Sequence, residues 1–270
     1  MKISGAFVEK VLTRFIREEL SKFNYEKAIL GLSGGLDSSV CAFLATRALS
    51  SKNVIALIMP YQKTFQQDVK DAQSLAKQLK VQWEIIDISP QVDAYFAKYP
   101  TENRIIKGNK MARERMSVLY DFSAREKALV LGTSNKTELL LGYGTIYGDT
   151  ACGLNPLGDL YKTQIRQLGQ HLGVPEKILK KTPSAGFWTG QTDEGELGLT
   201  YEEADKILFM LVDQMVSKKE IIGSGYKKET VEKIISLIKK SEFKRKMPPI
   251  PKISTRTVGH DFLYPYDWDK

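Results

Sequence analysis

The segment from Gly31 to Ser39 reads Gly-Leu-Ser-Gly-Gly-Leu-Asp-Ser-Ser and combines residue types that suit an anionic ligand. Gly34 and Gly35 let the main chain approach phosphate oxygens without an intervening Cβ, and the serines add hydroxyl donors. Asp37 is the odd residue, because a carboxylate beside a phosphate is repulsive unless a divalent cation lies between them. Mg²⁺ takes carboxylate and phosphate oxygens together, so the segment predicts a nucleotide phosphate site that uses Mg²⁺.

Two other phosphate motifs and one structural role compete with this interpretation. The segment has no Gly-Lys-Ser/Thr and is not a Walker A motif, and it lacks the GxGxxG of dinucleotide-binding folds. The structural role would be to start a helix, with Asp37 or Ser38 as its N-cap. The five specified residues of SGGxDS occur together by chance about once in two thousand chains of this length, which favours the phosphate site.

The elements around this turn alternate between buried strands and amphipathic helices. The expected strands are 27–35, 53–60, 81–88 and 128–135, and the expected helices are 7–20, 40–49, 66–79 and 111–127. This alternation predicts an α/β fold: a doubly wound parallel sheet of about five strands with helices on both faces. No clean domain boundary is visible, so we expect one domain over residues 1–270 with a helical C-terminal extension.

SGGLDS resembles the PP-loop signature of the ATP pyrophosphatases, enzymes that split ATP into AMP and pyrophosphate and attach AMP to a substrate. The resemblance implies an adenine nucleotide alpha hydrolase-like fold with strand order 3-2-1-4-5, in which strands 1 and 4 flank the ligand crevice. The fourth expected strand ends in GTSNKTE (132–138). Asp37 and Glu138 would then converge on one metal, whereas Glu138 alone would suggest only a helix-start glutamate favoured by the helix dipole.

Longer motifs narrow the resemblance to the ammonia-dependent NAD synthetases. They are GTSNKTE, NPLGDLYK (155–162) and PSAGFWTGQTDEGELG (183–198), and the similarity covers nearly the whole chain in order. The resemblance implies ATP-dependent amidation of deamido-NAD (nicotinic acid adenine dinucleotide) by ammonia, through an acyl adenylate, to give NAD, AMP and pyrophosphate. It also implies Mg²⁺ as cofactor and a homodimer, and the composition, with two separate cysteines, suggests a reduced, cytoplasmic protein. Glutamine-dependent relatives carry an additional glutaminase domain, for which 270 residues leave no room.

The same resemblance assigns roles to single residues. The ATP-binding residues would be Gly31, Leu32, Ser33, Gly34, Gly35, Leu36, Asp37, Ser38, Thr133, Lys162 and Ser184. Asp37 and Glu138 would hold the metal, and Asp37 and Lys162 would act in catalysis. The deamido-NAD residues would be Arg113, Asp149 and Lys244. Three positions on the dinucleotide side depart from the pattern of many members, namely Ile146, Gly153 and Phe243.

The composition excludes several classes of function. The longest apolar runs have six residues, as in 54–59, far short of the ~20 that a membrane span needs. Two cysteines without a CxxC and two histidines do not supply a structural zinc site of the usual spacing. The net charge of 40 − 32 = +8 predicts anionic partners. ATP and a dinucleotide account for that charge, so we expect neither a nucleic acid nor a membrane partner.

Other functions remain open on the sequence alone. Another PP-loop adenylating ligase, of the GMP synthetase or tRNA-modifying kind, would share the turn, and a non-catalytic nucleotide-binding protein would share the scaffold but need no metal pair. Two structural expectations follow. Residues 186–198 are rich in glycine and are expected to close as a lid over the reactive intermediate. The apolar side of residues 7–20 either packs on the sheet or contributes to a homodimer.

Overall fold

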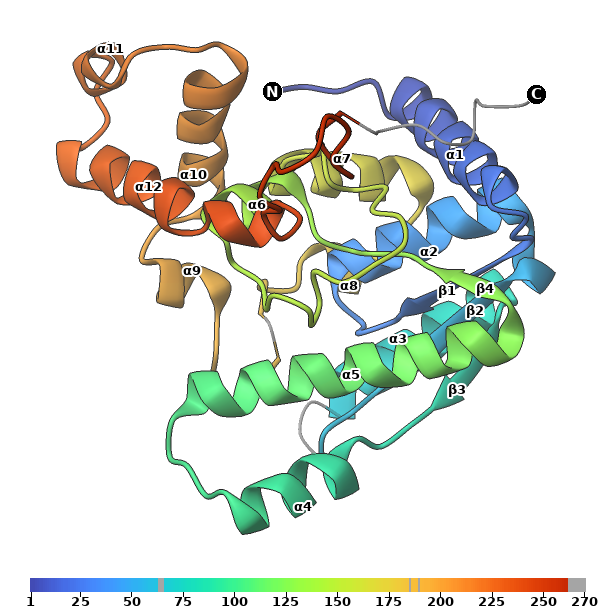
Figure 1. Ribbon diagram of the computed structural model, residues 1–270. Coiled ribbons are helices and arrows are strands. Elements are labelled where there is room, and N and C mark those ends of the chain that lie inside the picture. Colours follow the sequence, from blue (N-terminus) through green and yellow to red (C-terminus); the bar gives the residue numbers. More distant parts are fainter. Residues whose placement is uncertain (63–65, 185, 189, 262–270) are drawn as a thin grey trace.

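The computed structural model describes residues 1–62, 66–184, 186–188 and 190–261, and at its centre lies a parallel sheet with helices on both faces (Figure 1). The strands are β1 (Lys27–Gly31), β2 (Val54–Ile58), β3 (Gln82–Ile85) and β4 (Ala128–Val130), in the order β3-β2-β1-β4. All three strand pairs are parallel. The predicted α/β class and the doubly wound parallel sheet are therefore confirmed.

The expectation of about five strands is corrected by the structure: in the described residues the sheet has four strands. In place of a fifth strand, one isolated parallel bridge joins Leu131 to Leu154, and the Gly153 N–H donates to the carbonyl of Val130 at 2.9 Å. Pro156, two residues after Leu154, has no N–H to continue the pairing. The chain beside β4 is thus paired too briefly to count as a strand.

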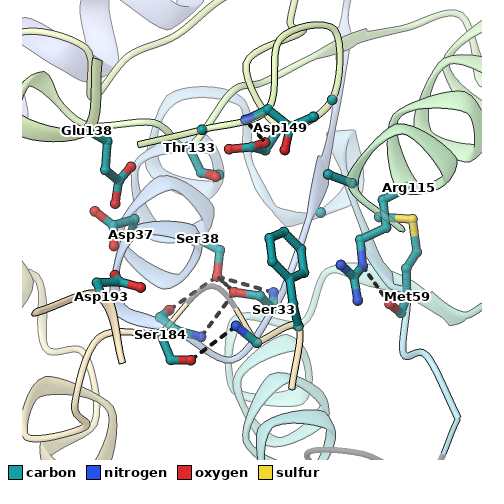
Figure 2. A pocket seen from close by; sticks show the side chains of 18 of the residues that line it. Ser33, Asp37, Ser38, Met59, Arg115, Thr133, Glu138, Asp149, Ser184 and Asp193 are labelled. Atoms are coloured by element: carbon teal, nitrogen blue, oxygen red, sulfur yellow. Dashed lines mark hydrogen bonds between the residues drawn. The ribbon is translucent and has the colours of Figure 1, made fainter. Parts of the chain in front are cut away.

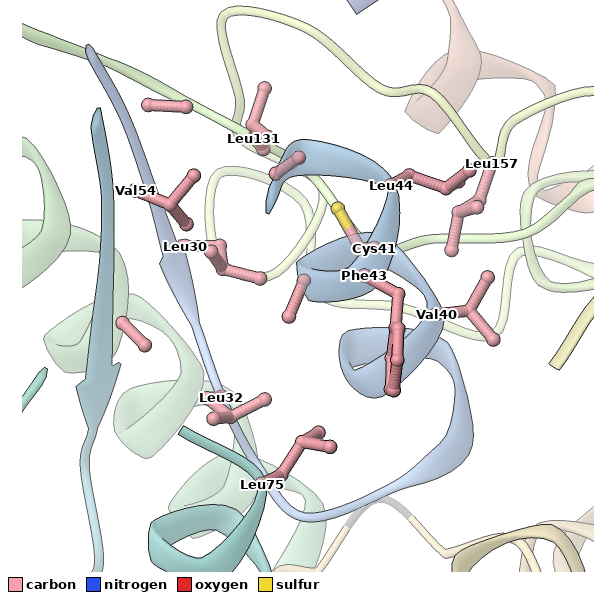
Figure 3. Packing of buried hydrophobic residues seen from close by; sticks show 14 of the residues in the cluster. Leu30, Leu32, Val40, Cys41, Phe43, Leu44, Val54, Leu75, Leu131 and Leu157 are labelled. Carbon is pink, nitrogen blue, oxygen red and sulfur yellow. The ribbon is translucent and has the colours of Figure 1, made fainter. Parts of the chain in front are cut away.

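Six helices cover the sheet: α1 (Gly5–Lys22), α2 (Leu36–Leu49), α3 (Gln66–Leu79), α4 (Ser89–Lys98), α5 (Arg104–Glu126) and α7 (Lys162–Leu172). Neighbouring residues of a strand point to opposite faces. In β1, Leu30 therefore packs with α2, α3 and α7 (Figure 3), whereas Ile29 packs with α4 and α5 on the other face. Both faces are apolar, which is why the strands read as continuous hydrophobic runs.

Two helices begin earlier than their apolar patterns suggest. Helix α2 starts at Leu36 rather than at residue 40, which places Asp37 in its first turn. Helix α5 starts at Arg104 rather than at residue 111, because the Asn103 side chain accepts hydrogen bonds from the N–H groups of Ile105 and Ile106 and caps the helix. Polar first turns carry no hydrophobic stripe, so the pattern located the helices but not their starts.

The helices after α7 are α8 (Glu176–Leu179), α9 (Asp193–Leu197), α10 (Tyr201–Leu208), α11 (Lys218–Gly223) and α12 (Lys228–Lys240), with α6 (Lys136–Leu141) preceding α7. Helices α10 to α12 lie together beside α6, away from the sheet (Figure 1), around a core of their own that includes Ile207, Ile221 and Ile234. None of the helices in the described residues has the length and apolar character that crossing a membrane requires.

Helix α1 divides its apolar residues between the core and the surface. Ile16 and Leu20 are fully buried against α2 and α7. Phe7, Val11 and Phe15, spaced four residues apart, remain 66%, 46% and 36% exposed. Packing on the sheet layer therefore explains only part of the predicted stripe, and three large apolar side chains of α1 are left at the surface.

Candidate functional site

A cavity of about 960 Å³ opens at the carboxyl ends of β1, β2 and β4, where the sequence places its glycine turn and second cluster. Thirteen of the predicted site residues form part of its wall: Gly31, Leu32, Ser33, Gly35, Leu36, Asp37, Ser38, Thr133, Glu138, Asp149, Lys162, Ser184 and Lys244. The other two, Gly34 and Arg113, do not line it. Figure 2 shows the arrangement of the principal side chains.

The glycine turn is held by its own serines. The Ser33 N–H donates to Ser38 Oγ at 3.2 Å, the Gly35 N–H donates to Ser33 Oγ at 3.2 Å, and the two hydroxyls lie 3.0 Å apart (Figure 2). Gly35 is the N-cap of α2, and no side chain caps that helix. The alternative role of Asp37 or Ser38 as the N-cap is therefore wrong. The turn instead presents main-chain N–H groups and hydroxyls to the cavity, as an anion site requires.

Asp37 and Glu138 lie in the wall opposite Arg115 (Figure 2). Lys162 lies against both of them. The Lys162 ammonium contacts Asp37 directly and lies 3.5 Å from Glu138 Oε1. Burial and the charge of Asp37 raise the pKa of Glu138 to about 8. Burial would lower the pKa of Lys162, but the two carboxylates outweigh it and raise that pKa. One lysine thus contacts two carboxyl groups, and the raised pKa of Glu138 shows that ionising both of them in this wall is unfavourable.

A third carboxyl group, Asp193, interacts electrostatically with Glu138 and Lys162. It is 4% exposed, it lines the cavity, and burial raises its pKa. The hydroxyls of Tyr143 and Tyr201 each donate to it at 3.0 Å. The sequence placed this residue in the lid without a role of its own, because its two tyrosine partners lie 50 and 8 residues away along the chain.

Asn135 contacts both Asp37 and Glu138, and it was not singled out from the sequence. Its side chain is fully buried, and its Nδ2 donates to Asp37 Oδ1 at 2.9 Å. Its Oδ1 accepts from the Glu138 N–H at 2.9 Å, while Glu138 Oε2 accepts from the Asn135 N–H, which makes a capping box at the start of α6. The pattern Asn-x-x-Glu was the available signal. The contact with Asp37 depends on the strand order and has no local signal.

Thr137 fixes the start of α7 in a similar way. Its buried hydroxyl accepts from the Lys162 N–H at 3.0 Å and donates to Asp205 Oδ1 at 2.6 Å. Asp205 also accepts from the Thr163 N–H at 2.8 Å, so one buried carboxylate of α10 ties α6 to α7. The position of the Lys162 side chain is set by this network.

The predicted dinucleotide residues lie in two different environments. Asp149 and Lys244 line the cavity: Asp149 accepts from the Thr145 N–H at 2.7 Å, and Lys244 donates to the carbonyls of Gly142 and Gly144 at 2.8 Å each. Burial raises the pKa of Asp149 and lowers that of Lys244. Arg113 is exposed on α5 and donates to the carbonyl of residue 146 at 3.2 Å, outside the cavity wall.

The three departures from the family pattern also have structural settings. A Cβ at Gly153 would lie 2.5 Å from Leu129 Cδ1, so packing against β4 explains the glycine. Ile146 holds Arg113 through its main-chain carbonyl only. Phe243 is 61% exposed and does not line the cavity.

Arg115, like Arg166 and Lys181, is a cationic wall residue that the sequence did not reveal. Its Nε donates to the carbonyl of Met59 at 2.9 Å, at the end of β2 (Figure 2). Burial lowers its pKa to about 10, so it stays protonated at neutral pH. Arg113 and Arg115 are two residues apart on one helix and therefore point to different sides; only the packing of α5 shows which of them faces the cavity.

A glycine turn between a strand and a helix, opening on a cavity with paired carboxylates and a lysine, defines an α/β enzyme that acts on nucleotide phosphates. The chain belongs to the NAD synthase family, whose model matches residues 8–248. It is 49% identical to the NH(3)-dependent NAD(+) synthetase of Trichlorobacter lovleyi over 100% of this chain and 99% of the relative.

Two solved structures are also similar. One is the NMN synthetase of Francisella tularensis, with a TM-score of 0.83 and 35% identity, covering 93% of this chain and 99% of that chain. The other is the NH3-dependent NAD synthetase of Campylobacter jejuni, in complex with the nitrate ion, with a TM-score of 0.80 and 35% identity over 93% of this chain and all of that chain.

Proposed function

We propose that this protein is a carbon–nitrogen ligase of NAD biosynthesis, which uses ATP to amidate deamido-NAD with ammonia and releases AMP and pyrophosphate. The observation that carries the proposal is the convergence of the glycine turn, Asp37, Glu138 and Lys162 on one cavity, in a chain of the NAD synthase family. Each of these groups acts on negative charge, and adenylation is a reaction in which charge shifts between phosphates.

The chemistry proceeds in two steps. The nicotinate carboxylate attacks the α-phosphorus of ATP, the bond to the β-phosphate breaks, and pyrophosphate leaves. Ammonia then attacks the carboxyl carbon of the acyl adenylate, AMP leaves, and a proton is released. The turn would hold the phosphates with its N–H groups and hydroxyls, and the Lys162 ammonium would stabilise the charge that develops on them. No protein nucleophile is required.

Asp37 and Glu138 are proposed to hold Mg²⁺ together with phosphate oxygens of ATP. Among the described residues, no three His, Cys, Asp or Glu side chains are grouped so as to hold a metal ion by themselves. Two adjacent carboxyl groups whose joint ionisation is unfavourable without a further cation fit Mg²⁺, which usually takes one or two protein carboxylates and completes its shell with phosphate and water. When bound, the ion would neutralise charge on the leaving pyrophosphate.

Residues 186–198 are proposed to close over the acyl adenylate. Phe187, Gln191 and Glu196 line the cavity, and the Phe187 ring packs so tightly on α5 that a Cβ at Gly108 would lie 2.6 Å from it. Limited proteolysis with and without ATP tests this role. Equal cleavage within the segment in both states would count against a lid.

The protein is further proposed to be a cytoplasmic homodimer. Support for a second copy comes from the exposed stripe of Phe7, Val11 and Phe15 on α1, and support for a reducing compartment comes from the free cysteines Cys41 and Cys152. Light scattering of the wild type and of a Phe7→Ser, Val11→Ser double variant tests the assembly. A dimer that persists unchanged in the variant would remove α1 from the interface.

One assay separates the proposed function from its alternatives. The protein is incubated with ATP, Mg²⁺, ammonium and deamido-NAD. Formation of NAD and AMP supports the proposal, ADP would refute the adenylation chemistry, and no turnover favours a nucleotide-binding protein. Because one structural relative is named an NMN synthetase, the acid corresponding to NMN is run as a competing substrate. Asp37→Asn should lower the rate by well over tenfold.

A further inference from the structure

Lys181 makes three polar contacts that link the glycine turn to helix α3. Its ammonium donates to the carbonyl of Gly34 at 2.9 Å, to Asp68 Oδ1 at 2.8 Å and to Asp71 Oδ2 at 2.7 Å. Burial would lower the pKa of Lys181, but its hydrogen bonds with the two carboxylates raise it. All three donors of this lysine are therefore used, and one of them acts on the turn itself.

The Gly34–Gly35 peptide is held from both ends. Its carbonyl accepts from Lys181, and its N–H donates to Ser33 Oγ at 3.2 Å. The carbonyl and N–H of one trans peptide point in opposite directions, so fixing the carbonyl also fixes where the Gly35 N–H points. Gly35 and Ser33 line the cavity, and this N–H is one of the groups that a phosphate would use.

Contact with α3 leaves the turn little freedom to move. Gly34 has a φ of +79°, and a Cβ there would lie 2.3 Å from the carbonyl oxygen of Asp68. The turn thus rests directly on the main chain of the first turn of α3, and Lys181 bridges the same two elements with a charged side chain. Lys181, Asp68 and Ser184 all line the cavity.

Asp71 anchors this arrangement in the core. It is 2% exposed and accepts from Lys181, from Lys177 at 2.8 Å and from Gln67 at 3.0 Å. Burial raises its pKa, but these hydrogen bonds outweigh burial and lower it to about 2. Lys177 and Lys181 therefore share one carboxylate, and no contact of Lys177 with the glycine turn is found among the described residues.

We propose that Lys181 is a positioning residue for the phosphate site, which holds the Gly34 carbonyl so that the Gly35 N–H and the Ser33 hydroxyl it contacts stay in place for ATP. The proposal rests on the proposed function only in taking ATP as the ligand of the turn. It distinguishes Lys181 from Lys177: both stabilise the fold through Asp71, but only Lys181 orients the turn.

The test compares Lys181→Met with Lys177→Met, a control that removes the same charge from the same carboxylate. Binding of a non-hydrolysable ATP analogue is measured by calorimetry with Mg²⁺ present, and KM and kcat are measured by NAD formation. We expect Lys181→Met to weaken analogue binding and raise KM for ATP by roughly tenfold, as for one lost charge-assisted hydrogen bond. In Lys181→Met, KM for deamido-NAD should change less than about twofold. In Lys177→Met, analogue affinity and KM for ATP should both stay within about twofold of the wild type.

A second variant keeps the proposal testable should Lys181→Met fail to fold. Asp68→Asn retains the shape of a side chain that is 33% exposed and removes one anchor of Lys181, so analogue binding should weaken by about threefold. The proposal would be overturned if Lys181→Met bound the analogue as tightly as Lys177→Met does. If Lys181→Met is unfolded, the same comparison is made with Asp68→Asn. A wild type that binds the analogue but makes no NAD would instead refute the proposed function and leave the binding comparison valid.

Discussion

Replacing Asn135 by aspartate or by alanine separates the two tasks that its buried side chain performs. As N-cap of α6 it accepts from the Glu138 N–H, and as an amide donor it holds Asp37 Oδ1 at 2.9 Å. Aspartate caps as well as asparagine, whereas alanine costs about 1 kcal/mol at an N-cap. Neither replacement can donate to Asp37, and a hydrogen bond to a charged group contributes about 1.5–3 kcal/mol. Aspartate also sets two carboxylates about 3 Å apart.

That repulsion decides which of the two variants is the less stable. Two like charges at this distance repel by about 5 kcal/mol at an effective dielectric constant of 20. Relaxation removes about half of this, which leaves about 2–3 kcal/mol. Without Mg²⁺, we expect a loss in the free energy of unfolding of about 2.5–4 kcal/mol for Asn135→Ala and about 3.5–6 kcal/mol for Asn135→Asp.

Urea denaturation in metal-free buffer measures the free energy of unfolding of both variants and so shows which is the less stable. A residue that served only as a helix cap would give the reverse order, with alanine the less stable variant, because aspartate retains the cap. An Asn135→Asp protein more stable than Asn135→Ala would therefore refute the argument that this amide positions Asp37. Rates of NAD formation complete the test: both variants should be slower than the wild type, since both free the Asp37 carboxylate.

Three further predictions follow from the same geometry. Lys162→Met should lower the rate of acyl-adenylate formation by at least ~100-fold, measured in single-turnover assays, and should destabilise the free protein by leaving two buried carboxylates without their cation. Gly34→Ala should weaken ATP binding and destabilise more than the left-handed strain of about 1–2 kcal/mol, because its Cβ meets the chain of α3 at 2.3 Å; Gly173→Ala, at φ +85° with open space, should show the strain alone. Asp71 has a folded pKa of about 2, below its ordinary 3.8, so its contribution to stability should be present at neutral pH and be lost as pH falls from about 4 towards 2; acid denaturation of Asp71→Asn should lack that component.

The sequence located the chemistry more fully than the architecture around it. Asp37, Glu138 and Lys162 could be predicted because each lies in a short motif, and the structure brings all three together at one wall. The number of strands could not be predicted in the same way. Whether 151–156 forms a strand depends on main-chain hydrogen bonds beside β4, and Pro156 limits these after a single bridge.

The residues that position the site escaped prediction for a common physical reason. Thr137, Asn135 and Lys181 are polar residues whose partners are distant in sequence, so neither hydrophobic periodicity nor local motif shows that they are buried or aimed inwards. The place of Arg115 in the cavity wall depends on how helix α5 is rotated about its axis, because a shift of two residues would have placed Arg113 there instead. Such roles follow from packing, which the sequence specifies only through the whole fold.

The electrostatics of the cluster explain why it suits a nucleotide with its cation. Asp37 and Glu138 lie in the first turns of α2 and α6, where helix dipoles favour carboxylates, but Lys162 is the first residue of α7, where the dipole disfavours a cation by about 0.3–1 kcal/mol. Burial adds to that cost, and the charges of Asp37, Glu138 and Asp193 offset it. A lysine kept in an unfavourable position by removable partners is typical of a functional site rather than of a stabilising one. On the proposed function, ATP with Mg²⁺ would bring both signs of charge: Asp37 and Glu138 would hold the metal, and the Lys162 ammonium would pair with phosphate oxygens. Each buried charge would keep a partner throughout, so the lysine becomes available to the phosphates only when substrate and cation are both present.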